Sequence, residues 1–199
     1  MFLLRFTSPI EELQSTMELK LRSVRAADIP SLHEILVVCG LDLQERFGLD
    51  YWLPPYPLEK MRQDLEDKRI YCISVGREVV ATFTLETKMP SEYTRYGKIH
   101  WQVVDVSAMY VHRLAVLPTW QGQGLGTWCL QAIENLAINS DCGAVRLDAV
   151  KMNSKLSVFY QRQDYRLVGE LIYDPETLFN DAFVFEKVLP KSIFNNWRL

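Results

Sequence analysis

Features that would place the chain at a membrane or on nucleic acid are missing from its 199 residues. No stretch approaches the roughly 18 consecutive apolar residues of a membrane span. The apolar start at residues 1–6 is too short for the core of a signal peptide. No block of lysine and arginine stands out, and the formal net charge is −3. The sequence therefore predicts no membrane span and no nucleic-acid partner, and we expect a cytoplasmic protein.

Patterns for metal binding are also missing. The histidines show no ligand spacing and the cysteines contain no C-x-x-C pair; these residues are His33, His100, His112, Cys39, Cys72, Cys129 and Cys142. Without such spacing, the sequence predicts no metal site. Cys129 falls on the apolar side of a predicted helix, so we expect a buried, reduced thiol there.

What the chain does have is a strand, a glycine loop and a helix in succession. Residues 109–116 are β-branched or apolar except at two positions, which predicts a strand that Pro118 ends. Gln-Gly-Gln-Gly-Leu-Gly follows at 121–126, and apolar residues then recur at helical spacing from Leu125 onward. The loop and the helix start together predict an anion site, because glycines let backbone N–H groups approach a phosphate and the helix terminus supplies further donors.

Two common phosphate-binding motifs do not fit this loop. A dinucleotide-binding G-x-G-x-x-G needs a third glycine at Thr127 or Cys129, and the Gly-Lys-Ser/Thr of a P-loop does not occur in the chain. What remains is Gln-x-x-Gly-x-Gly, which resembles the acyl-CoA pyrophosphate loop of the GCN5-related N-acetyltransferase (GNAT) superfamily. The resemblance implies that the pyrophosphate of acetyl-CoA is held by main-chain amides of Gln121, Gly122, Gln123, Gly124, Leu125, Gly126 and Thr127.

A second stretch extends the resemblance. Residues 144–150 form a predicted buried strand containing Arg-Leu-Asp, and Asn153 stands at the N-cap of a short helix that includes Tyr160. The superfamily pattern implies that Asn153 bonds the pantetheine arm and that Tyr160 protonates the departing thiolate. The alternatives are a plain helix cap and a core aromatic ring. Asp164-Tyr165 replaces the usual Gly-Phe, and Asp tolerates the left-handed backbone expected there.

Aminolysis of a thioester needs a base for the amine proton, a donor for the oxyanion and an acid for the thiolate. By resemblance, the oxyanion donor is a backbone N–H of the splayed strand, from Leu114, Ala115 or Val116. Several relatives carry a glutamate base at the position of Tyr110. His112, on the same strand face, and Glu86, at the end of the preceding strand, are the candidate bases here. A hydrogen-bonded structural role is the alternative for His112.

The order of predicted elements is β-α-α-β-β-β-α-β-α-β-β. Strands are expected at 18–24, 71–75, 79–86, 109–116, 144–150, 165–169 and 183–188, with helices opening near 28, 58, 125 and 153. The pattern alone indicates a single α/β domain. The resemblance implies a mixed sheet with splayed parallel central strands and helices on both faces. We expect this domain at 17–188, with an N-terminal extension at 1–16 and a C-terminal tail at 189–199.

Two aromatic segments lie outside the shared framework. Residues 46–57 include Tyr51, Trp52 and Tyr56, and the long link at 88–106 includes Trp101. Long links inside compact domains are often functional, so we expect these rings to line a substrate pocket. The alternatives are that the rings cover sheet edges, and that Ile99–Val106 forms an extra strand.

The resemblance, carried by residues 110–165, is to poorly characterised bacterial members of the small-molecule type. It implies acetyl transfer from acetyl-CoA to a primary amine, by direct attack in a ternary complex of a monomer or homodimer. Because Tyr110 stands at the glutamate position, a non-catalytic acyl-CoA sensor or scaffold remains open. So does acetylation of a protein N-terminus or lysine.

Overall fold

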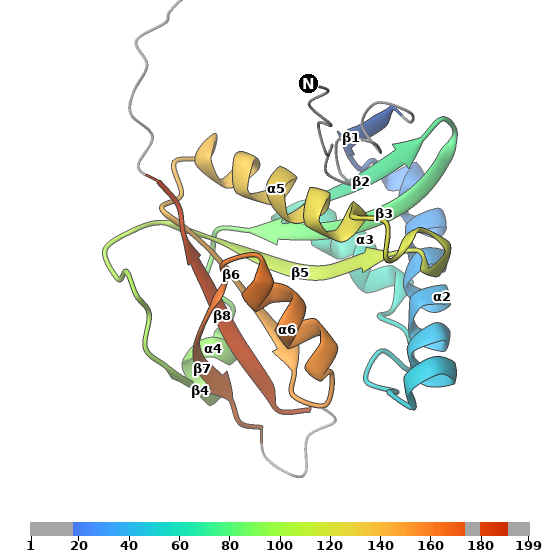
Figure 1. Ribbon diagram of the computed structural model, residues 1–199. Helices are drawn as coiled ribbons and strands as arrows, with labels where there is room; N and C mark the ends of the chain where they lie inside the picture. Colours follow the sequence, from blue (N-terminus) through green and yellow to red (C-terminus); the bar gives the residue numbers. More distant parts are fainter. Residues whose placement is uncertain (1–17, 174–179, 191–199) are drawn as a thin grey trace, which may run out of the picture. The chain divides into compact units, whose positions relative to one another are not determined.

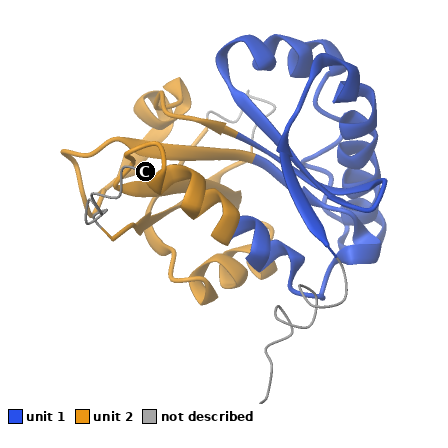
Figure 2. Cartoon of the chain, turned by 90° about the horizontal axis from the view of Figure 1, so that it is seen from above, with its two compact units in different colours: residues 1–84, 113–130 blue, residues 85–112, 131–199 orange. Residues whose placement is uncertain are grey.

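The computed structural model describes residues 18–173 and 180–190 (Figure 1). The chain divides into two compact units (Figure 2). Unit 1 comprises the chain up to Thr84 together with Arg113–Leu130, and unit 2 comprises Leu85–His112 and the chain from Gln131 onward. The predicted extension at 1–16 and residues 191–199 of the predicted tail lie outside the described residues. None of the helices in the described part is long and apolar enough to cross a membrane.

Both units contain helices and strands. Unit 1 contains β1 (Leu19–Ser23), the 3-10 helix η1 (Ala26–Asp28), α2 (Ile29–Phe47), α3 (Leu58–Asp67), β2 (Arg69–Val75) and the 3-10 helix η2 (Pro118–Trp120). Unit 2 contains α4 (Ser91–Tyr96), β4 (Gly97–Ile99), β6 (Ala144–Val150), α6 (Ser154–Arg162), β7 (Arg166–Leu171) and β8 (Ala182–Val188). Three further elements have residues in each unit: β3 (Glu78–Glu86), β5 (Ala108–Val116) and α5 (Leu125–Ile138).

The strands form a mixed sheet in the order β1-β2-β3-β5-β6-β8-β7-β4. β5 and β6 run parallel, but within unit 2 they pair only where Ala108–Tyr110 lies opposite Ala144–Arg146. β6 pairs antiparallel with β8 along its whole length, from Ala144 to Val150. The early end of β5–β6 pairing confirms the splay of the central parallel strands that the superfamily resemblance implied.

In unit 1, α2 and α3 pack against β2. The apolar face of α2 is buried and consists of Ile29, Leu32, Ile35, Leu36 and Cys39. This face belongs to one core cluster with Met61 of α3 and with Ile70 and Cys72 of β2. The alternate residues Ile70 and Cys72 point to the same face of their strand, so the helices cover that face.

Unit 2 carries helices on both faces of its strands. Val184 of β8 shares a buried cluster with Tyr93 of α4. Its neighbour Phe185 contacts the ring of Tyr160 in α6, with centroids 5.7 Å apart. Because successive side chains of a strand point to opposite faces, α4 and α6 cover opposite faces of β8. The predicted arrangement of helices on both faces is thus confirmed within this unit.

The link between β3 and β5 departs from the prediction. It contains α4 and β4, neither of which the sequence pattern indicated, and the alternative of an extra strand at Ile99–Val106 is wrong because residues 100–107 form no strand. The His100 N–H still donates to the Val168 carbonyl of β7 at 2.8 Å, but the next backbone groups bond to side chains. The Gln102 N–H donates to Glu186 Oε2 at 2.6 Å, and the Val103 carbonyl accepts from Arg146 Nη2 at 2.7 Å.

Candidate functional site

The glycine loop in unit 1 has the backbone that an anion cradle needs. Gly122 and Gly124 have φ of 75° and 86°, in the left-handed region that residues with a Cβ avoid. A Cβ added at Gly122 would meet nothing within 4 Å, so the space over the loop is open. α5 begins at Leu125, and its first N–H groups have no intrahelical partner. Loop and helix therefore present bare backbone donors at one place.

Side-chain hydrogen bonds hold this loop in shape. Gln121 donates from Nε2 to the Val116 carbonyl at 2.9 Å and accepts at Oε1 from Arg46 Nη2 at 2.9 Å. Gln123 donates from Nε2 to the Thr119 carbonyl at 2.8 Å. Both glutamine side chains are thus bonded to the backbone, and that of Gln121 also to α2, which fixes the shape of the loop.

In unit 2 the cap expected at Asn153 is confirmed. Its Oδ1 accepts the N–H of Leu156 at 3.1 Å at the start of α6. The turn after α6 is kept as predicted, because Asp164 adopts φ of 66°. Tyr160 is buried, and its ring lies 5.5 to 6.1 Å from three other aromatic rings, those of Phe159, Phe185 and Tyr165.

Unit 2 also brings the two candidate bases together. His112 Nε2 lies 2.7 Å from Glu86 Oε1, and the two side chains are 18% and 12% exposed. The two atoms are at contact distance, but their geometry is not that of a hydrogen bond. A recessed imidazole beside a carboxylate can accept a proton and stabilise the resulting positive charge.

Sequence reasoning missed a second polar pair in the same unit. The Tyr93 hydroxyl donates to Asp148 Oδ1 at 2.9 Å. Burial raises the pKa of Asp148, while the Tyr93 hydrogen bond and the charge of His112 act against that rise. Burial and the neighbouring Asp148 raise the pKa of Tyr93 well above its usual range. Asp148 is the last residue of the Arg-Leu-Asp motif, which was the available signal.

Tyr110 lies in a buried ionic cluster. Arg146 donates from Nη1 to the Tyr110 hydroxyl at 2.9 Å and from Nε to Glu186 at 2.9 Å. Trp101 lies against the Arg146 guanidinium, with the ring centroid 3.9 Å from Cζ. The Arg146–Glu186 ion pair, which the sequence did not indicate, therefore lies beside Tyr110 and Trp101.

The aromatic residues predicted for a pocket in segment 46–57 have mixed surroundings. Trp52 and Tyr56 pack against the core of α2, α3 and β2. The Tyr56 hydroxyl also donates to Asp64 Oδ2 at 3.0 Å, and Tyr51 is half-buried. These rings therefore support the core of unit 1, in addition to any contact that they make with an acceptor.

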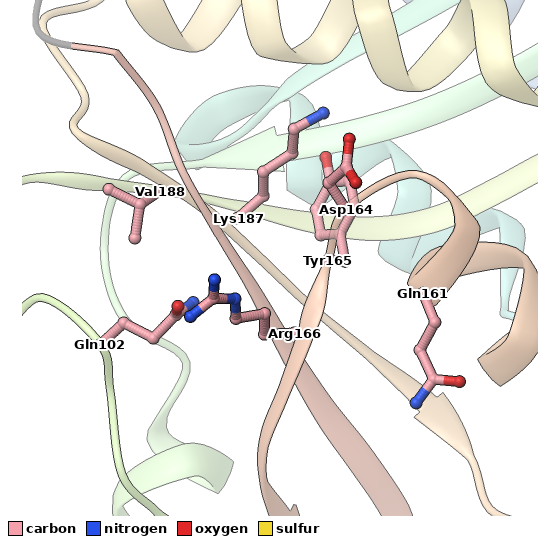
Figure 3. A pocket seen from close by; sticks show the side chains of 7 residues that line it. All are labelled: Gln102, Gln161, Asp164, Tyr165, Arg166, Lys187 and Val188. Atoms are coloured by element: carbon pink, nitrogen blue, oxygen red, sulfur yellow. The ribbon is translucent and has the colours of Figure 1, made fainter.

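A polar pocket of about 470 Å³ lies elsewhere in unit 2 (Figure 3). It is lined by Gln102, Gln161, Asp164, Tyr165, Arg166, Lys187 and Val188, none of which was predicted as a site residue. The Arg166 guanidinium points toward the Gln102 side chain in Figure 3. Among the described residues, no group of three or more His, Cys, Asp or Glu side chains is arranged to hold a metal ion.

Comparison with known sequences decides the family. The sequence model of the Acetyltransferase (GNAT) family matches residues 32–165. The chain belongs to the GNAT acetyltransferase family. Among curated proteins, this acetyltransferase is similar to the uncharacterized N-acetyltransferase YesJ of Bacillus subtilis (strain 168), with 28% identity over 145 residues, which cover 71% of this chain and 78% of YesJ.

Solved structures agree on the fold of this acetyltransferase. A GNAT-family acetyltransferase from Streptococcus agalactiae aligns with a TM-score of 0.71 at 15% identity, covering 87% of this chain and 96% of the other. The ribosomal-protein-S18-alanine N-acetyltransferase of Escherichia coli aligns at 0.61 and 15%, covering 91% and 99%. A GNAT acetyltransferase from Elizabethkingia anophelis with acetyl-CoA bound aligns at 0.59 and 15%, covering 86% and 98%.

Proposed function

We propose that this GNAT enzyme transfers the acetyl group of acetyl-CoA to the primary amine of a small molecule. The observation that carries the proposal is the bare loop in which Gly122 and Gly124 take left-handed backbones immediately before α5. Such a loop binds a diphosphate through main-chain N–H groups and the positive end of a helix dipole. The acetyl-CoA held by the Elizabethkingia relative supports the same donor here.

The donor side of the proposal assigns roles to loop and helix residues. Main-chain amides from Gly122 to Thr127 bind the diphosphate, whereas the Gln121 N–H already donates to the Pro118 carbonyl at 3.2 Å. The amide group of Asn153 binds the pantetheine arm. Asn153 caps α6 through Oδ1, and its amide nitrogen is the donor group of the side chain. Tyr160 protonates the leaving thiolate, because its phenol hydroxyl is a proton donor in a buried position.

The acceptor side of the proposal rests on the contact between His112 and Glu86. The attacking amine must lose a proton, and His112 accepts it while Glu86 at 2.7 Å stabilises the imidazolium. An N–H of Leu114, Ala115 or Val116 stabilises the oxyanion. The recessed position of His112 and Glu86, together with the buried Tyr93–Asp148 pair, favours a small acceptor over a folded protein.

A two-stage experiment tests the proposal. Acetyl-CoA should raise the melting temperature by a shift that grows with its concentration. A panel of small primary amines, and a matched panel of peptides with free N-termini, should then be assayed for release of the CoA thiol. We expect release with small amines. No thermal shift at millimolar acetyl-CoA would contradict the donor assignment, whereas binding without thiol release would favour a sensor. Acetylated peptides detected by intact mass would favour a protein acceptor.

A further inference from the structure

Arg113 has an unusual backbone in the middle of β5. Its φ is 49°, in the left-handed region, where the Cβ of an L-residue crowds the following carbonyl oxygen. Non-glycine residues stay in this region only when their surroundings fix them there. A single left-handed residue in a strand redirects the next peptide group, as a β-bulge does. The peptide redirected here carries the N–H of Leu114.

The side chain of Arg113 is held on three sides within unit 1. Its Nη2 donates to Asp64 Oδ2 at 2.5 Å and lies 3.3 Å from the Thr84 hydroxyl oxygen. Its guanidinium carbon lies 4.0 Å from the centroid of the Tyr56 ring. Tyr56 in turn donates to the same Asp64 oxygen. We call Arg113, Asp64, Thr84 and Tyr56 the guanidinium latch. Its ion pair is largely buried, with side chains 18% and 12% exposed.

The end of β5 is fixed from a second direction. The Val116 carbonyl accepts from Cys39 Sγ of α2 at 3.3 Å and from Gln121 Nε2 of the glycine loop at 2.9 Å. The Leu117 N–H returns to β3 by donating to the Val80 carbonyl at 2.9 Å. The segment from Arg113 to Val116 is therefore anchored at both ends by side chains, which is the arrangement that keeps a strained backbone in place.

We propose that Arg113 is a positioning residue, and that the guanidinium latch keeps β5 bent so that the N–H of Leu114 points at the carbonyl oxygen of the bound thioester. The inference rests on the proposed function, because it requires an acyl-CoA donor. Arg113 acts here through the backbone of its neighbour and does not contact the reacting atoms. Its contribution is to hold a donor in the direction that the developing oxyanion needs.

Replacing Arg113 by alanine and by glycine separates backbone positioning from a direct role. Arg113→Ala removes the latch but keeps a Cβ, so the backbone should relax toward the extended region. Arg113→Gly removes the latch too, but glycine occupies the left-handed region without strain. Calorimetry measures the affinity of the wild type and of each variant for two ligands, acetyl-CoA and S-ethyl-CoA. S-ethyl-CoA is a thioether that lacks the carbonyl oxygen. An N–H aimed at the carbonyl makes acetyl-CoA bind roughly two- to tenfold tighter than S-ethyl-CoA.

We expect the wild-type protein to show this preference, Arg113→Ala to lose it and Arg113→Gly to retain most of it, with S-ethyl-CoA affinity unchanged throughout. Asp64→Asn, which weakens the latch without altering β5, should also reduce the preference, and it carries the test if Arg113→Ala does not fold. Three outcomes would overturn this inference but not the proposed function. They are an equal loss of the acetyl-CoA preference in the alanine and glycine variants, an unchanged preference in Asp64→Asn, and no preference in the wild type. Failure of the wild type to bind either ligand would overturn the proposed function as well.

Discussion

Tyr160 has an aromatic enclosure that suits a proton donor as well as a core residue. Three rings surround it, and its position on α6 follows the Asn153 cap by seven residues. Tyr165, 6.1 Å away between ring centroids, is also a buried tyrosine, and its hydroxyl donates to Glu134 Oε1 at 3.3 Å. The two phenols differ in proposed role and little in packing, so they form a matched pair for mutation.

Tyr160→Phe should therefore lower kcat and leave CoA affinity unchanged, because only the proton for the leaving thiolate is lost. General acid catalysis contributes about a hundredfold or more, so kcat should fall by about that factor. Tyr165→Phe is the control and should keep its kcat. Steady-state kinetics with calorimetry of CoA measure both quantities. An unchanged kcat in Tyr160→Phe removes this residue from the mechanism.

Asp148 gives a pH-dependent prediction whose sign follows from its burial. Its pKa is raised chiefly by desolvation, so the folded state favours the protonated carboxyl. The ionisation of Asp148 then leaves folding stability unaffected below the usual pKa of about 3.9. Above that pH its contribution to stability falls until pH passes the raised pKa of the folded state, and it is constant at higher pH. Asp148→Asn cannot ionise and keeps an oxygen that accepts from Tyr93. The variant should gain stability over the wild type as pH rises from about 4.

Urea titrations across the acidic range measure that gain, and Asp28→Asn supplies a control of opposite sign. Hydrogen bonds from Arg22 and from the Arg25 N–H lower the pKa of Asp28 to about 2. The stabilisation of the folded state by the Asp28 carboxylate is therefore present above the usual pKa of the group and is lost as pH falls toward about 2. Asp28→Asn should destabilise the protein at neutral pH by an amount that shrinks on acidification. A pH-independent difference for Asp148→Asn would contradict the assignment.

At the scale of elements, periodicity predicted the long helices and strands well. α2 and β5 lie where their apolar patterns placed them, and the short α6 begins at its predicted cap. α4 and β4 were missed because six and three residues are too few for a helical or alternating pattern to repeat. The residues that follow β4 bond to Arg146 and Glu186 of β6 and β8, and no local pattern encodes such distant partners.

The glycine loop allows a test at the level of one element. Gly122→Ala should weaken CoA binding, because alanine disfavours φ of 75° and displaces the amides that face the diphosphate. Gly76→Ala is the matched control: this hairpin glycine has φ of 58° and, like Gly122, open space where the added methyl group would lie. Both variants should lose about 1–2 kcal/mol of stability.

Calorimetry of CoA then distinguishes the two glycine variants. Only Gly122→Ala should bind CoA more weakly, and a tenfold loss of affinity corresponds to about 1.4 kcal/mol of binding free energy. Equal CoA affinity in the two variants would show that the loop does not bind the diphosphate through its backbone.

At the scale of the whole molecule, the sequence predicted the acetyltransferase family from local motifs and missed the polar pairs that join distant positions. The predicted donor motifs are local: Gln121–Gly126 spans the glycine loop and the first two residues of α5, and Asn153 is the N-cap of α6, the helix that holds Tyr160. The buried polar pairs join distant positions, such as Tyr93 with Asp148 and Arg146 with Glu186, which are 55 and 40 residues apart. Only the folded chain reveals such pairs.

Family membership fixes acetyl transfer as the reaction of this enzyme and leaves its acceptor to experiment. The most direct test follows both products of one reaction, with acetyl-CoA and the best amine of the small-molecule panel as substrates. We predict that the CoA thiol and the acetylated amine appear in equal molar amounts and at equal rates. Thiol release without acetylated amine, or no release with any small amine while a peptide is acetylated, would contradict the proposed transfer to a small molecule.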